Sequence, residues 1–236
     1  MSWQIPSYLG TFTGLLGDHL LMALSASFLG LVLSLPLGLA CIRWPVLYGP
    51  VLAGASALYA VPSLAFFVLL IAFTGIAPLT VIIPLALYTL SGLVPNVVDG
   101  LRSVPEVVRQ SATAMGMGPG RRLLAVDLPI ALPAVMAGLR VATVANISMV
   151  SVGALIGMGA FGSLFTASAQ LDRVELAVIG IIATIGMALV IDVILVLAQR
   201  SLTPWTRAGT SPAVRWGPGR ALATIRQGSS TRGGGA

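Results

Sequence analysis

The chain has 236 residues, of which only 8% are charged and 57% are hydrophobic, with a mean hydropathy of +0.99. Soluble domains carry about 25% charged residues, so this chain cannot surround a globular core with a solvating shell. The net charge of +6 arises because 13 arginines, and no lysine, face 7 acidic residues. We therefore exclude a soluble enzyme, a nucleic-acid-binding domain and a disordered protein, and expect a chain whose solvent is lipid.

Five segments are apolar and long enough to cross a membrane as helices, which takes about 20 residues at ~1.5 Å per residue. The second segment contains Pro62, and we expect one long helix that kinks there, because either half alone is too short to span. The predicted fold is an all-α integral membrane protein. The five spans are residues 20–42, 46–73, 77–95, 138–157 and 176–198.

The arginines between these spans predict the orientation, because basic residues accumulate on the cytoplasmic side. With the N-terminus outside, twelve arginines fall inside and only Arg173 falls outside. We therefore predict an N-out/C-in chain with an extracytoplasmic segment at 1–19 and a transmembrane domain at 20–198. Residues 199–236 form a basic tail rich in glycine and serine, whose composition predicts a disordered cytoplasmic segment.

The predicted cytoplasmic loop, residues 96–137, carries its own helical pattern. Ser103-Val104-Pro105-Glu106 fits a capping box with proline in the first turn, and Gly116 ends the helix that follows. Such a short helix either lies in the groove of a partner protein or packs against its own bundle, and both interpretations stay open. Small and apolar residues share one face of it: Val104, Val107, Val108, Ser111, Ala112 and Met115.

The spacing of this loop resembles a known signature. Permease subunits of binding-protein-dependent ABC importers carry Glu-Ala-Ala, three residues, Gly, nine residues, Ile or Val, any residue, Leu-Pro. This chain has Gln110-Ser111-Ala112, Gly116 and Val126-Asp127-Leu128-Pro129 at matching spacing. Gln110 and Ser111 replace the usual Glu and Ala, and Glu106 stands one turn earlier as an alternative source of the negative charge.

The resemblance implies that residues 103–116 are a coupling helix that docks on an ATPase subunit. The implied coupling residues are Glu106, Gln110, Ser111, Ala112, Gly116, Leu128 and Pro129. The chain itself is then no enzyme and holds no cofactor, because ATP and Mg²⁺ bind the partner subunit. The other implied partners are a second permease copy or paralogue, a separate substrate-binding protein and the lipid bilayer, with no nucleic acid.

Further strings, such as Val61-Pro62-Ser63-Leu64-Ala65, resemble the osmoprotectant branch of this family. Members of that branch import glycine betaine, choline, carnitine and proline betaine across the bacterial cell (inner) membrane, which implies the same substrates and location here. One alternative is a permease for another small solute, such as an amino acid or a phosphonate. Another is a small membrane-embedded enzyme, for which the single His19 and Cys41 supply no catalytic or metal-binding cluster.

Several residues inside the spans are candidates for the translocation path. Tyr59 and Tyr88 can offer aromatic faces to a quaternary ammonium group, and packing or lipid contact is the alternative. Asn146 lies in the middle of a span, where an amide either lines a pathway or joins helices. The candidates are Tyr59, Pro62, Tyr88, Asn146, Gly157 and Gly159.

Three further features lie in or near the ends of the predicted spans. Gly157 to Gly162 matches G-x-G-x-x-G, but it ends a membrane span, so we expect a turn that re-enters beside the path and no nucleotide site. His19 follows Asp18 at the outer edge, where we expect an interfacial position. Asp192 lies two turns before Arg200, so we expect its carboxylate to reach the inner interface.

Overall fold

The computed structural model describes the backbone of residues 5–207 and the side chains of residues 12–205. It divides the chain into two compact units, Met1–Leu202 and Thr203–Ala236. Within the second unit the structure describes a short 3-10 turn, Pro204–Arg207, and the predicted disorder of the tail concerns residues that lie mostly outside the described ones. The regular elements of residues 5–202 are all helical: α1 (Ile5–Arg43), α2 (Tyr48–Ala60), α3 (Ser63–Thr74), α4 (Pro78–Arg102), α5 (Glu106–Ala114), α6 (Pro119–Arg122), α7 (Leu128–Val150), α8 (Gly162–Leu171) and α9 (Val174–Leu202), with 3-10 turns at Pro45–Leu47 and Ser151–Ile156 and a π-helical turn at Leu123–Asp127.

The helices confirm an all-α membrane fold with about five spans. In the described part of the chain, four helical stretches are long and apolar enough to cross a membrane, and a bent pair makes a fifth candidate. The four stretches are Phe12–Arg43, Pro78–Arg102, Pro119–Ile156 and Val174–Leu202. The N-out/C-in orientation stays a prediction.

The second predicted span is not one kinked helix. The segments Pro45–Ala60 and Ser63–Thr74 meet at 92°, and both residues between them are extended, with ψ of 128° at Val61 and at Pro62. Proline lacks a backbone N–H and pushes the preceding residue out of the helical region. The chain therefore stops at Ala60, turns at Val61-Pro62 and starts a separate helix.

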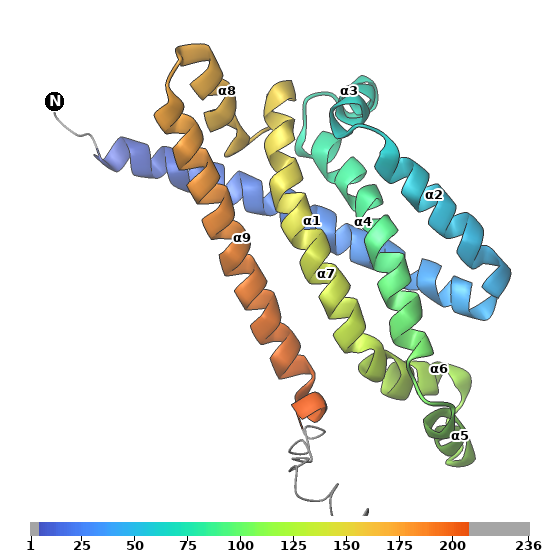
Figure 1. The fold of residues 1–236 in the computed structure, drawn as a ribbon. Helices are drawn as coiled ribbons and strands as arrows, with labels where there is room; N and C mark the ends of the chain where they lie inside the picture. The colour runs from blue at the N-terminus through green and yellow to red at the C-terminus, as the bar shows by residue number, and fades with distance from the viewer. Residues whose placement is uncertain (1–4, 208–236) are drawn as a thin grey trace, which may run out of the picture. The chain divides into compact units, whose positions relative to one another are not determined.

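Helix α4 is the centre of the bundle. About two thirds of its apolar window is buried, against 6% for α9. Figure 1 shows α1 crossing α4 and α7, with α9 alongside α7. Glycine allows the close crossing of α1 and α4, because a Cβ at Gly30 or at Gly38 would overlap the side chain of Thr89 or of Val97.

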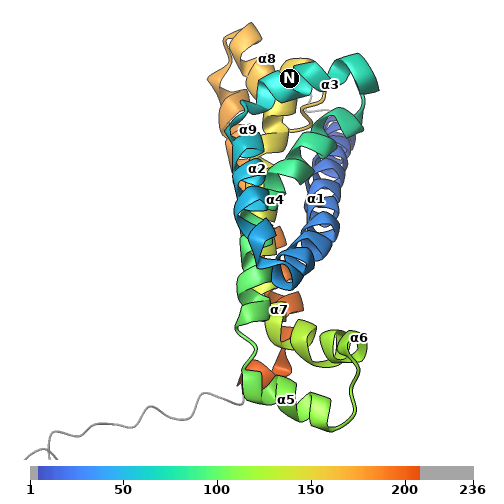
Figure 2. The same ribbon diagram turned by 90° about the vertical axis from the view of Figure 1, so that its right-hand side faces the viewer.

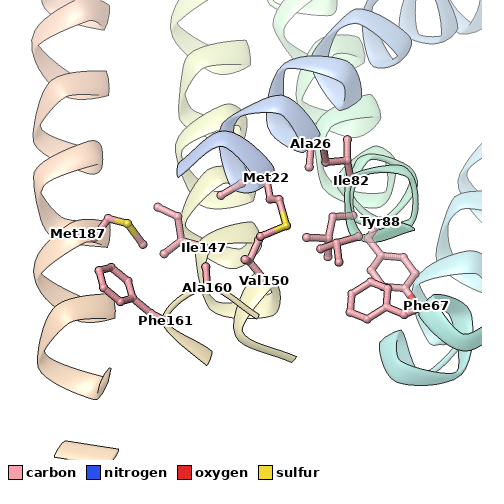
Figure 3. Close-up of a cluster of buried hydrophobic side chains, with 13 residues drawn as sticks. Met22, Ala26, Phe67, Ile82, Tyr88, Ile147, Val150, Ala160, Phe161 and Met187 are labelled. Atoms are coloured by element: carbon pink, nitrogen blue, oxygen red, sulfur yellow. The ribbon is translucent and has the colours of Figure 1, made fainter. Parts of the chain in front are cut away.

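A buried apolar cluster joins the helices at one end of the bundle. It includes Met22 of α1, Phe67 of α3, Ile147 of α7, Phe161 in the turn before α8, and Met187 of α9. Figure 3 shows Phe161 and Met187 approaching Ile147, so the turn before α8 and the last helix contribute to the same core as the first helix.

Helices α5 and α6 project from the opposite end of the bundle to α3 and α8 (Figure 2). The predicted capping box does not form: Ser103 donates its hydroxyl to the Gly100 carbonyl oxygen, and no described side chain caps α5. Ser103 is itself helical and extends the last turn of α4, so it cannot adopt the extended conformation that an N-cap residue needs. Helix α5 therefore begins at Glu106, three residues after the predicted start.

Candidate functional site

The first candidate site is the outer face of α5. Val107 and Met115 are 72% and 71% exposed, and the side chains of Glu106, Gln110 and Ser111 are exposed beside them. Glu106 lies in the first turn, where a negative charge is favourable. The helix thus presents a mixed apolar and polar surface that is free to receive a partner.

The predicted apolar face of this helix is divided in two. Val104 and Ala112 are buried against the chain, whereas Val107, Ser111 and Met115 are exposed. The helix therefore packs on its own bundle along one side and leaves the other side uncovered, and docking of that uncovered side on a partner stays a prediction.

The remaining signature residues lie away from the exposed face. Gly116 has a φ of +81°, which glycine adopts without strain, and it makes the turn after α5. Leu128 is half-buried at the start of α7 and packs against the cluster of Val97 and Leu101, while Pro129 lies in the first turn of α7. These three residues shape the loop, and their assignment to coupling stays a prediction.

Sequence reasoning missed an ion cluster behind α5. The Asp127 side chain is 8% exposed, and its carboxylate lies between two guanidinium groups, with Arg109 Nε 3.2 Å from Oδ1 and Arg122 Nε 3.6 Å from Oδ2. Arg109 also donates from Nη2 to the Leu101 carbonyl oxygen at 2.6 Å. One sequence feature could have indicated this cluster. Asp127 places a charge at the variable position of the Val-x-Leu-Pro signature, close to several arginines of the same loop.

The second candidate site is a cavity of about 300 Å³ between α2, α4 and α7. The rings of Tyr59 and Tyr88 meet edge to face with centroids 5.6 Å apart, and the Tyr88 hydroxyl donates to the Val61 carbonyl oxygen at 2.7 Å. The structure thus brings Tyr59, Tyr88 and Asn146 together, and their role in translocation stays a prediction. The polar and aromatic residues lining the cavity are Tyr59, Tyr88, Thr89, Ser91, Asn96 and Asn146.

Asn146 both joins helices and lines this cavity. Its amide nitrogen donates to Ser27 Oγ at 2.9 Å and to Thr89 Oγ1 at 3.0 Å, which connects α7 to α1 and to α4. An amide in the middle of a span needs such partners, because hydrocarbon supplies none. The two interpretations of Asn146 are compatible in this arrangement.

The other path candidates lie elsewhere. Pro62 is exposed at the break between α2 and α3, next to Val61, whose carbonyl oxygen accepts the Tyr88 hydrogen bond. Gly157 and Gly159 line a different cavity of about 580 Å³, next to α1 and the start of α4. Gly157 has a φ of +82°, so this segment is a tight turn, as expected.

His19 is buried inside the bundle, and its predicted interfacial depth stays a prediction. Its Nε2 donates to the Ile147 carbonyl oxygen at 2.7 Å, while its Nδ1 accepts from the Phe161 N–H at 3.4 Å. The ring thereby connects α1, α7 and the turn before α8. Because both nitrogens have partners inside the bundle, the buried ring leaves no polar group unsatisfied.

Asp192 has a partner that sequence reasoning also missed. Arg140 of α7 binds its carboxylate with two hydrogen bonds of 2.8 Å, from Nε to Oδ1 and from Nη2 to Oδ2. The pair lies on a groove of about 680 Å³ between α7 and α9. Pairing lowers the cost of a charge inside a span, which is the reason intramembrane carboxylates rarely stand alone.

The fold defines a multi-pass α-helical membrane protein with an intramembrane cavity and a helical loop at one end, an architecture suited to a transport permease. The model of one family, described as binding-protein-dependent transport system inner membrane component, matches residues 30–208. The chain belongs to this family, so it is a transport permease component of the inner membrane.

Relatives and solved structures agree with this assignment. The chain is 29% identical to the choline transport system permease protein OpuBB of Bacillus subtilis, over 79% of this chain and 86% of that protein. It is 32% identical to the osmoprotectant import permease protein OsmW of Salmonella typhimurium, over 83% of this chain and 93% of that protein. The inward-facing MetNI methionine ABC transporter has the same fold, with a TM-score of 0.74 at 20% identity over 86% of this chain and all of that one.

Proposed function

We propose that this chain is the permease subunit of an ATP-driven ABC importer for osmoprotectant quaternary amines, such as glycine betaine, choline, carnitine and proline betaine. The relatives named for choline and osmoprotectant transport support this substrate class, and they match the chain over most of their own length. A separate binding protein delivers the substrate to the outer side of the membrane.

The cavity beside Tyr59 and Tyr88 is the observation that carries the substrate proposal. A quaternary ammonium group has no N–H to donate, so aromatic faces can stabilise it without a carboxylate. None of the described residues that line the cavity carries a charge. Hydroxyl and amide groups, such as those of Ser91 and Asn96, are available for the carboxylate or hydroxyl group at the other end of the solute.

The same lining disfavours a phosphonate. A phosphonate is best held by cationic side chains, and none of the described residues that line the cavity carries a charge. The fold shared with the methionine transporter concerns architecture alone, since the identity is 20%. The membrane-enzyme alternative has no support in a family of transport components.

The exposed face of α5 supports the partner proposal. ATP and Mg²⁺ bind a partner ATPase subunit, which receives Val107, Gln110 and Met115 in a surface cleft. This requires α5 in the cytoplasm, in agreement with the N-out/C-in orientation that the arginines predict. A second permease, either another copy of this chain or a paralogue, completes the pore.

The test is reconstitution with its ATPase and binding protein in proteoliposomes, followed by uptake of labelled glycine betaine, choline, methionine and a phosphonate. We expect ATP-dependent uptake of the two quaternary amines and none of the others. Uptake of methionine or the phosphonate alone would refute the substrate proposal while leaving the permease assignment intact. If the ATPase failed to co-purify with the chain, the coupling proposal would fail.

A further inference from the structure

Arg109 lies on α5 but faces away from the exposed docking surface. Its guanidinium group donates from Nη2 to the carbonyl oxygen of Leu101, in the last turn of α4, and from Nε to the carboxylate of Asp127, directly before α7. One side chain of the loop helix is therefore bonded to both flanking helices. Leu101 lies 8 residues before Arg109 in the sequence, and Asp127 lies 18 residues after it.

Physical chemistry favours both contacts. The Leu101 carbonyl is among the last four of α4, which have no donor within their own helix, and an arginine supplies one with a favourable charge. Asp127 is nearly buried, so a carboxylate without charged or hydrogen-bonded partners would be costly there. Arginine suits both sites at once, since its planar fork carries five donors and stays protonated.

The two helices held by Arg109, α4 and α7, are two of the three that line the proposed substrate cavity. Asn96 of α4 lies five residues before Leu101, and Gly138 of α7 lies eleven residues after Asp127, which corresponds to roughly 8 Å and 17 Å along the helices. The segment Leu123–Asp127 is a π-helical turn, a local irregularity that often marks a functional site in a helix. A displacement of α5 at this point would act on the ends of both cavity-lining helices.

We propose that the Arg109–Asp127 pair transmits the movement of α5 to α4 and α7, so both are positioning residues for coupling and neither contacts the ATPase. This inference rests on the proposed function, because it presumes that α5 moves with an ATPase subunit. The alternative is that the pair only stabilises the fold of the loop. The two interpretations differ in one measurable quantity, the number of solutes taken up per ATP hydrolysed.

The test uses the complete reconstituted importer with R109Q, D127N and the double variant. We expect ATP hydrolysis to continue while uptake per ATP falls about fivefold or more, the size of an ordinary coupling between two sites. Because the residues act as a pair, the double variant falls no further than either single one. R109K should have an intermediate ratio of uptake to ATP hydrolysis. Its single ammonium group keeps the charge but cannot reach Leu101 and Asp127 with the geometry of a guanidinium group.

The matched control is R121Q, which removes the same charge from the same loop. Arg121 is exposed and forms no ion pair with another described residue, so its ratio should equal that of the wild type. The inference is overturned if the assembled R109Q and D127N complexes keep the wild-type ratio of solute uptake to ATP hydrolysis. Should R109Q fail to assemble, R109K gives the same test, and an unchanged ratio in R109K contradicts the inference. A wild-type complex without any quaternary-amine uptake would instead refute the proposed function.

Discussion

Arg140 of α7 and Asp192 of α9 form a two-pronged ion pair 52 residues apart in the sequence, with both hydrogen bonds at 2.8 Å. The pair is the polar connection between a helix that lines the cavity and a helix whose apolar window is only 6% buried. Since α9 buries so little surface in this chain, a directional contact fixes its position along α7 more strictly than apolar packing can.

Asp192→Asn should therefore lower the thermal stability of the purified protein in detergent, because Arg140 keeps its charge without a counter-ion. The charge-exchanged variant R140D/D192R restores the pair and should recover most of the loss. The measurement is a thermal unfolding scan of the wild type and the three variants D192N, R140D and R140D/D192R. Equal destabilisation by the exchanged and the single variants would show that the pair itself does not hold α9.

Tyr59→Leu should raise the KM for quaternary-amine uptake by about 2- to 30-fold, the range expected for one aromatic contact with a cation. The matched control is Tyr48→Leu at the other end of α2, whose ring lies 5.2 Å from the Arg102 guanidinium carbon and outside the cavity. Initial uptake rates at several substrate concentrations separate the two. A similar KM for both variants would remove Tyr59 from the path.

Val107→Glu should weaken the association with the ATPase subunit about tenfold, which corresponds to ~1.4 kcal/mol. The side chain is 72% exposed, so the substitution adds a charge to the docking surface without disturbing the fold. Leu124→Glu serves as the control, because Leu124 is 69% exposed in the same loop but lies outside α5. Co-purification yields would contradict the docking face if Leu124→Glu had the larger effect.

Gly38→Ala should destabilise the bundle by about 1–3 kcal/mol, the usual cost of forcing a methyl group into a packed contact. The added Cβ would overlap the side chain of Val97 in α4. Gly54→Ala, on α2, meets nothing within 4 Å and should be neutral or slightly stabilising. Unfolding in mixed detergent would give the two free energies, and equal values would argue against a close α1–α4 crossing.

The spans were predictable because a run of about 20 apolar residues has few structures open to it in lipid. The same physics does not reveal the partners of polar residues near the ends of the spans. Asp18 and His19 interrupt the apolar run, and only the structure shows that His19 is satisfied by Ile147 and Phe161, more than 120 residues away. A polar residue gives no sign in the sequence of a hydrogen-bond partner that lies far along the chain.

The loop between α4 and α7 shows the same limit. Spacing located the helix, but the capping pattern at Ser103 was ambiguous, since a serine after a helix can extend that helix as well as start the next. The Asp127 cluster needed three elements to be placed together, and the Arg140–Asp192 pair needed two helices in register. Local patterns predict elements, whereas the pairing of charges depends on how elements pack.

The break at Val61-Pro62 has a consequence for the surrounding lipid. The helical segment Pro45–Ala60 measures roughly 25 Å against a hydrocarbon layer of about 30 Å, and the next helix departs at 92°. This flank of the protein is too short for an average bilayer unless the lipid thins beside it or a neighbouring chain covers it. Uptake should then depend on acyl-chain length in vesicles, with shorter chains favoured. A membrane stretched and thinned by osmotic swelling would act on the transporter through the same flank.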